Sequence, residues 1–168
     1  MYFFTATINS WQPLLLDDKL KVVILDAFNW FQTNNKSAIH AFVIMPNHFH
    51  VIMSPLNNFL QADNETALLS FTGHAFKKYL KENNVQLLQN YKSTQADRSF
   101  HFWERRSHTI ELMSRKIVEQ KIDYIHDNPC QPKWNLASHP ILYKYSSAKF
   151  YQTNVDDFGF LSSYTELS

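Results

Sequence analysis

The pattern of apolar and polar positions along the chain predicts a series of alternating strands and helices. Aromatic, β-branched or alternating runs that are typical of strands occupy Tyr2–Ile8, Ile39–Met45, His48–Met53 and Phe100–Trp103, with Val85–Leu88 as an additional short candidate. Apolar residues recur at helical spacing in Asp17–Thr33, Glu65–Lys81 and Glu111–Asp127. The last helix should end at Asn128, since a residue before proline avoids the helical region.

The order of the first six elements is strand, helix, strand, strand, helix, strand, which is the split βαβ or ferredoxin-like pattern. We therefore predict an α+β sandwich with one antiparallel sheet, helices on one face, and a further C-terminal helix. A chain of 168 residues fits one domain with a sizeable core. The prediction is a single domain over 1–168, with an irregular tail from about residue 143.

Composition excludes several classes of protein. The chain is 45% hydrophobic and 18% charged, as in globular proteins. It has only 2 glycines, which excludes glycine-rich phosphate loops and dinucleotide-binding loops. A single cysteine, Cys130, excludes an internal disulfide and a cysteine-based zinc site. The net charge of +1 does not by itself predict nucleic-acid binding.

The compartment is expected to be the cytoplasm, with no membrane contact. The N-terminus lacks a basic leader and a cleavage pattern. Residues 37–62 carry no charged side chain, but prolines and asparagines interrupt this stretch, so that it is typical of two strands and a turn rather than of a membrane span.

The most informative feature is a pair of histidines separated by one apolar residue, His48-Phe49-His50. Side chains alternate between the faces of a strand, so His48 and His50 should point the same way and Phe49 the other way. Two solvent-facing imidazoles side by side suit two ligands of one divalent metal ion. The plainer alternative is a pair of partly exposed polar residues near a strand end.

A second pair lies near the end of the last predicted helix. Tyr124 and Asn128 are four residues apart and so share one helix face. If that face looks toward the histidines, Asn128 can supply a third, oxygen ligand, with Tyr124 one turn away. The alternatives are an amphipathic tyrosine that packs with its hydroxyl outward, and an asparagine that only stops the helix before Pro129.

Basic and aromatic residues are grouped in two regions. Arg98, Arg105 and Arg106 surround the aromatic run that ends at Trp103, and Lys133 lies in a stretch, 128–155, without any acidic residue. Such residues suit stacking on bases and contacts to phosphates, and Trp103, Arg105, Arg106 and Lys133 are therefore our candidate DNA-binding residues. The alternative is an ordinary solvated surface.

Taken together, these motifs resemble a known family. Met45–His50 and Tyr124–Pro129, with Phe102–Arg106 and Tyr143–Ala148 as further matches, resemble the REP-associated tyrosine transposases, which belong to the IS200-like single-tyrosine HUH transposases. The similarity extends from about Phe3 to Tyr151. After Pro129 the chain reads Cys130–Trp134, where the family usually has valine, a basic residue and Ala-Gly. This departure concerns the loop conformation and the DNA specificity.

The resemblance implies a ferredoxin-like fold with the histidines on a central strand. It also implies Mg²⁺ or Mn²⁺ bound by His48, His50 and Asn128, and Tyr124 as the catalytic nucleophile on the C-terminal helix. The implied reaction is cleavage and rejoining of single-stranded or hairpin DNA through a 5′-phosphotyrosine intermediate, by a monomer or a homodimer.

Three other functions are compatible with the sequence. One is a metal-dependent phosphoester hydrolase that uses water as the nucleophile. Another is a hairpin-binding protein without catalytic activity. The third is a ferredoxin-like protein that binds a small molecule.

Overall fold

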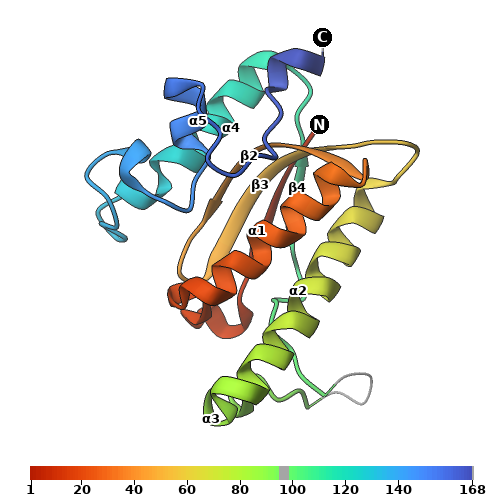
Figure 1. Ribbon diagram of the computed structural model, residues 1–168, viewed down its shortest axis with the longest axis vertical. Coiled ribbons are helices and arrows are strands. Elements are labelled where there is room, and N and C mark those ends of the chain that lie inside the picture. Colours follow the sequence, from red (N-terminus) through yellow and green to blue (C-terminus); the bar gives the residue numbers. More distant parts are fainter. Residues whose placement is uncertain (95–98, 168) are drawn as a thin grey trace.

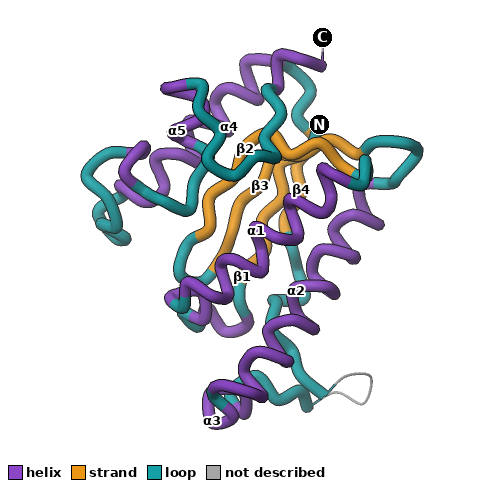
Figure 2. The backbone as a smooth tube through the Cα atoms, in the orientation of Figure 1, coloured by secondary structure: helices purple, strands orange, loops and turns teal. Residues whose placement is uncertain are grey.

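A computed structural model describes residues 1–94 and 99–167. Its centre is one antiparallel sheet of four strands, shown in Figures 1 and 2: β1 (Tyr2–Thr7), β2 (Ser37–Ile44), β3 (His48–Pro55) and β4 (His108–Glu111). The strand order is β2-β3-β1-β4, and all three neighbouring pairs are antiparallel. This order and the sequence of elements confirm the predicted ferredoxin-like α+β fold.

Helices cover both faces of this sheet (Figure 1). On one face lie α1 (Asp18–Thr33) and α2 (Gln61–Asn83), and on the other lies α4 (Arg115–Asp127). Local sequence starts two of these helices: the Asp17 side chain accepts a hydrogen bond from the Lys19 backbone N–H, and Ser114 caps α4 in the same way. The extra helix predicted after the split βαβ unit is therefore present.

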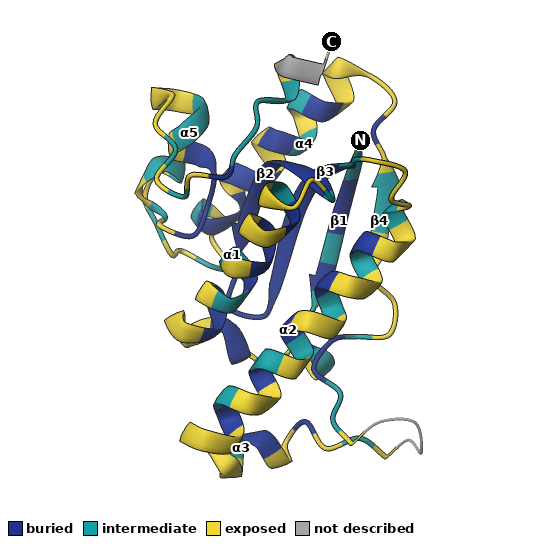
Figure 3. Cartoon of the chain, turned by 45° about the vertical axis from the view of Figure 1, so that its right-hand side comes forward, coloured by how far each residue is buried: buried dark blue, intermediate teal, exposed yellow. Residues whose placement is uncertain are grey.

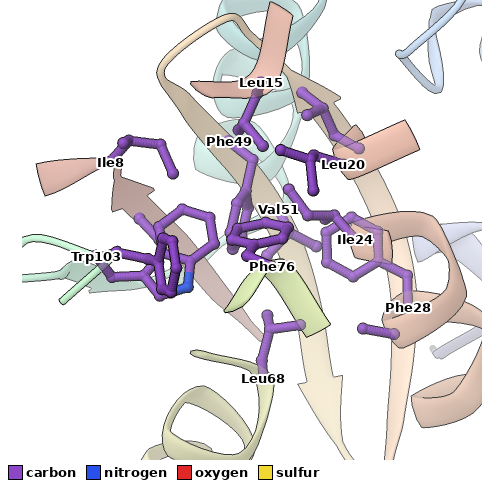
Figure 4. Packing of buried hydrophobic residues seen from close by; sticks show 14 of the residues in the cluster. Ile8, Leu15, Leu20, Ile24, Phe28, Phe49, Val51, Leu68, Phe76 and Trp103 are labelled. Carbon is purple, nitrogen blue, oxygen red and sulfur yellow. The ribbon is translucent and has the colours of Figure 1, made fainter. Parts of the chain in front are cut away.

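Two apolar clusters hold the layers together. The first lies between the sheet and helices α1 and α2, where Phe28, Phe49, Phe76 and Trp103 meet largely edge to face (Figure 4). The second, smaller cluster lies beneath α4 and includes Val118, Ile122 and Ile125. Strands β2 and β3 are consequently buried almost throughout, as Figure 3 shows.

The fourth strand is not where the sequence pattern placed it. Phe100–Trp103 forms only isolated bridges, from Trp103 to Ile8 and from Phe100 to Lys92, whereas His108–Glu111 pairs with β1. The run of aromatic residues is apolar because it packs under α2, not because it belongs to the sheet. β4 was missed because it is short and half-exposed, so its hydrophobic alternation is weak.

Two other predicted elements are corrected. Val85–Leu88 belongs to a short helix, α3 (Val85–Gln89), because the Asn84 side chain accepts a hydrogen bond from Leu87 and caps it. Helix α4 begins at Arg115 rather than Glu111, since Glu111 still pairs with Tyr2 of β1.

The tail from residue 143 is more regular than predicted. Tyr145 and Ser147 hydrogen-bond to Ile44 and Phe42, so this segment covers the outer edge of β2. Helix α5 (Ala148–Thr153) follows, and Ser162 later donates to the Ile39 carbonyl. Within the described ranges, no helix is both long and apolar enough to span a membrane.

Candidate active site

The alternation predicted for β3 is confirmed. His48 and His50 lie on the α4 face with ring centroids 4.8 Å apart, whereas Phe49 packs into the opposite cluster, 5.8 Å from Phe4 and 5.3 Å from Trp103. The two imidazoles are therefore neighbours on a rigid, central strand, which is the geometry that two ligands of one metal ion need.

The expectation that these imidazoles face solvent is wrong. His48 and His50 are only 6% and 5% exposed, because Trp134 lies 5.6 Å from the His48 ring and Tyr124 lies 5.4 Å from the His50 ring. Burial, helped by nearby positive charge, lowers the pKa of His48 to about 4 and that of His50 to about 3. Both rings are thus neutral at pH 7, the form that binds metal ions.

Asn47 determines which nitrogen of His48 is free. The Asn47 amide nitrogen donates to the Trp11 carbonyl oxygen at 3.2 Å, so the amide oxygen faces His48 Nδ1 at 2.7 Å. An amide oxygen can only accept, and His48 Nδ1 must therefore carry the proton. The other nitrogen, Nε2, keeps its lone pair for a ligand.

Thr5 occupies the equivalent position beside His50. Its hydroxyl lies 2.7 Å from His50 Nδ1, across the β1–β3 pairing that places Thr5 directly opposite His50. His50 Nε2 is buried and has no hydrogen-bond partner among residues 1–94 and 99–167. When Nδ1 donates to the hydroxyl, Nε2 presents a free lone pair on the face that His48 also occupies.

Helix α4 brings Tyr124 to this pair. Its apolar residues Val118, Ile122 and Ile125 pack on the sheet, which leaves Tyr124 at the side of the contact, 51% exposed. The Tyr124 ring meets His50 edge-on at 5.4 Å. Lys121, one turn earlier, places its ammonium 5.4 Å from the centroid of the Tyr124 ring. The nucleophile predicted from the sequence is thus adjacent to the predicted metal ligands.

Asn128 ends α4 and is 5% exposed. Its side-chain oxygen Oδ1 is buried, and no residue in the described part of the chain hydrogen-bonds to it. Among the residues that the structure describes, no three His, Cys, Asp or Glu side chains gather to hold a metal ion, so a third ligand must be of another type. An unpaired amide oxygen and two neutral imidazoles make a donor set that fits Mn²⁺ and, with added water ligands, Mg²⁺.

His126 has a structural role rather than a place in this site. Its Nε2 lies 2.8 Å from Ser147 Oγ, and burial lowers its pKa to about 4. Ser147 in turn accepts from the Phe42 backbone N–H, so this contact ties α4 to β2.

The candidate DNA-binding residues are not gathered in one place. Trp103 is 7% exposed, stacks within the first apolar cluster and donates its indole N–H to Thr72, so the expectation that it stacks on a base is wrong. Arg105 and Arg106 are exposed, and Arg105 lines a cavity of about 890 Å³ beside α2. Arg98 lies outside the described residues.

Lys133, by contrast, lies beside Trp134, whose ring is 5.6 Å from the His48 ring, and its ammonium is 5.7 Å from the indole centroid. Sequence reasoning missed four residues of this neighbourhood: Thr5, Asn47, Lys121 and Trp134. Asn47 directly precedes the histidines and Lys121 lies one turn before Tyr124, so both had a usable signal. Only the strand register reveals Thr5, and only the folded loop reveals Trp134.

Comparisons with known proteins identify the fold. No model of a protein family matches the sequence, and no curated protein matches it. Among solved structures, a REP-associated tyrosine transposase bound to a REP hairpin superposes with a TM-score of 0.66 and 18% identity, over 96% of this chain and 85% of that one. The chain has the fold of a REP-associated tyrosine transposase.

A protein from Deinococcus radiodurans with a provisional transposase description also matches, with a TM-score of 0.47 and 17% identity, over 76% of this chain and 89% of that one.

Proposed function

We propose that this chain is a metal-dependent, single-tyrosine HUH transposase that cleaves and rejoins hairpin-forming, single-stranded DNA. One observation carries the proposal: Tyr124 lies 5.4 Å, ring to ring, from a histidine whose Nε2 is buried and unpaired. A protein that only binds DNA has no need of an unpaired imidazole beside an exposed tyrosine. The fold shared with a hairpin-bound transposase supports the same conclusion.

The proposed metal ligands are His48, His50 and Asn128. A bound divalent ion would neutralise and orient the phosphate that is attacked. Burial keeps both imidazoles in the neutral form. Asn47 and Thr5 hydrogen-bond to the Nδ1 atoms of His48 and His50, so both rings are oriented before any ion binds. The apolar cluster under α4 fixes the distance between these ligands and Tyr124.

Tyr124 would perform the covalent step. Its oxygen attacks the phosphorus and forms a phosphotyrosine bond, while the bond from phosphorus to the 3′-oxygen breaks and that oxygen takes up a proton. The tyrosine proton can pass to water, because Tyr124 is half-exposed. In the second step a DNA 3′-hydroxyl attacks the phosphotyrosine, which restores the phosphodiester and the tyrosine. No nucleotide cofactor is consumed.

The charge around the site suits a phosphate backbone. Lys121 lies over the Tyr124 ring, and Lys133 lies by the Trp134 ring that neighbours His48, so an approaching anion meets positive charge. The hairpin in the solved neighbour makes hairpin DNA the first substrate to test.

The test uses a labelled hairpin oligonucleotide with single-stranded flanks and Mn²⁺, followed by a denaturing gel. We expect a covalent protein–DNA band with the wild-type protein and none with Tyr124→Phe or without the metal. Cleavage without an adduct would show a water-using hydrolase, and binding without cleavage would show a non-catalytic hairpin-binding protein.

A further inference from the structure

Trp134 presents a buried hydrogen-bond donor that no described residue satisfies. Its indole nitrogen Nε1 is closed off from bulk water and has no partner. Leaving such a donor unpaired costs about 1–3 kcal/mol, so buried polar groups are usually paired. The other buried indole of this chain, that of Trp103, follows the rule and donates to Thr72 at 3.0 Å.

Two other unpaired buried atoms, on two proposed metal ligands, have the complementary chemistry. His50 Nε2 and Asn128 Oδ1 can act as acceptors, which is what a cation requires, whereas an indole N–H only donates. Trp134 therefore cannot be a metal ligand. A donor beside a cation site fits an oxyanion that the cation attracts.

The position of Trp134 fits the same ligand. Its ring lies 5.6 Å from the His48 ring, and the ammonium of Lys133 lies 5.7 Å from the indole centroid. Lys133 is exposed and makes no ion pair within the described part of the chain. An anion at this point would be met by the ammonium and the indole together.

We propose that the Trp134 indole N–H donates a hydrogen bond to a phosphate oxygen of the DNA bound beside His48, with Lys133 as the paired charge. The inference rests on the proposed function and adds a phosphate-binding residue to it. Because Nε1 is closed off from bulk water in the free protein, the loop that carries Lys133 and Trp134 would shift as the DNA binds and so uncover the N–H. This loop is also where the sequence departs from the family it resembles, so the contact would belong to this chain in particular.

Nuclear magnetic resonance of the ¹⁵N-labelled protein tests the contact directly. The chain has 4 tryptophans, so the indole region holds four signals, and Trp134→Phe assigns one of them. The Tyr124→Phe protein with Mg²⁺ is titrated with the hairpin oligonucleotide. We expect the Trp134 signal to move downfield, and the signal of Trp30, on the exposed face of α1, to stay in place. A Trp134 signal that does not move at saturating DNA would overturn the inference.

Affinity gives a second measurement. Trp134→Phe keeps the ring and removes only the donor, so we expect roughly tenfold weaker binding of the hairpin, the size of a hydrogen bond to a charged group. Trp30→Phe is the matched control and should bind as the wild type does. Equal affinity for both variants would contradict the proposal.

Failure of this inference is distinguishable from failure of the proposed function. The adduct gel decides the function, and the Trp134 signal decides the contact. A covalent adduct together with an unmoved Trp134 signal would reject the phosphate contact and leave the proposed function standing. A moved Trp134 signal without an adduct would support the contact and reject the proposed cleavage reaction.

Discussion

The side-chain oxygen of Asn47 lies 2.7 Å from Nδ1 of His48, the next residue in the chain. Neighbouring residues on a strand point to opposite faces, but Asn47 precedes β3 and sits in the turn, where its amide reaches both the imidazole and the Trp11 carbonyl. Ser10 and Trp11 have φ values of 57° and 56°, the left-handed region, in the turn that supplies this carbonyl. A turn with left-handed backbone and an asparagine together hold the ring of His48, a proposed metal ligand.

Asn47→Ala should weaken divalent-ion binding by about 10–100-fold, the usual effect of losing the partner of a ligating histidine. The reason is that His48 could then adopt either tautomer and rotate. Calorimetric titration with Mn²⁺ measures the affinity. Asn83→Ala, which removes an amide that donates to the Tyr79 carbonyl within α2, is the control and should bind normally. Unchanged affinity in Asn47→Ala would show that the ring is held by packing alone.

Tyr124→Phe should abolish the covalent adduct and leave folding unchanged. The ring keeps its contacts with Phe3 and His50, and the lost hydroxyl belongs to a half-exposed residue, so we expect a change in unfolding free energy within about 0.5 kcal/mol. Hairpin binding should persist. Peptide mapping of a trapped wild-type adduct should place the DNA on Tyr124, and a linkage to Tyr143 or Tyr145 would refute this assignment.

His50→Ala and Phe49→Ala should separate the chemistry of β3 from its packing. Phe49 is fully buried among aromatic rings, so its loss should cost about 3–5 kcal/mol of stability while the remaining folded protein still binds Mn²⁺. His50→Ala removes an unpaired polar atom along with its ring, and should lose Mn²⁺ binding at a smaller cost in stability. Thermal unfolding with and without Mn²⁺ measures both effects.

Asn128→Ala should weaken Mn²⁺ binding more than hairpin binding, because the proposed role of Asn128 is to supply an oxygen ligand from a position that is already buried and unpaired. Parallel titrations with Mn²⁺ and with the oligonucleotide compare the two losses. Equal Mn²⁺ affinity in the variant and the wild type would remove Asn128 from the set of ligands.

The free energy of unfolding of the metal-free protein should decrease as the pH is lowered below about 6.5, the ordinary histidine pKa. Burial lowers the pKa of His40 in the folded protein. As the pH decreases, His40 is therefore protonated in the unfolded chain before it is protonated in the folded chain, and this favours unfolding. His40 contributes at most about 1.4 kcal/mol per pH unit in this range, with its full stabilisation present above pH 6.5. Urea unfolding at pH 7.5 and 5.0 measures the slope.

The matched comparison is His40→Gln against His74→Gln. His40 is enclosed between the Ser162 carbonyl and the Ser54 hydroxyl, whereas His74 lies exposed on α2. The first variant should show a flatter dependence on pH than the wild type, and the second should match the wild type. Parallel slopes in all three proteins would exclude His40 as a source of the acid sensitivity.

The sequence predicted the parts of this fold that have strong local periodicity. The alternation His48-Phe49-His50 placed both imidazoles on one face of a strand, as the structure confirms. Helical spacing placed Tyr124 and Asn128 on one face of a helix and left open whether that face meets the histidines, which Tyr124 does through His50. Both predictions rest on fixed periods of the backbone, which tertiary packing does not change.

What the sequence could not predict depends on contacts between distant segments. A run of aromatic residues around Trp103 has the same composition whether it forms a strand, a stacking surface or a core, and only its position against α2 decides. Burial of the histidines likewise depends on α4 and on Trp134, which lie more than 60 residues away in the sequence. For the same reason Thr5 was not predicted, since it meets His50 through strand register.

Because side chains alternate along β3, an error in its pairing with the neighbouring strands would strongly destabilise the fold. A slip of one residue would carry both imidazoles into the aromatic cluster and turn Phe49 toward Tyr124, because every side chain would exchange faces. Two polar rings would then lose their partners at once, and the aromatic cluster would lose a ring from its centre. A chain with β3 in the wrong register would therefore lose its packed core together with its proposed active site. Resistance to proteolysis, which requires the packed core, would then also show that the histidines and Tyr124 are correctly placed.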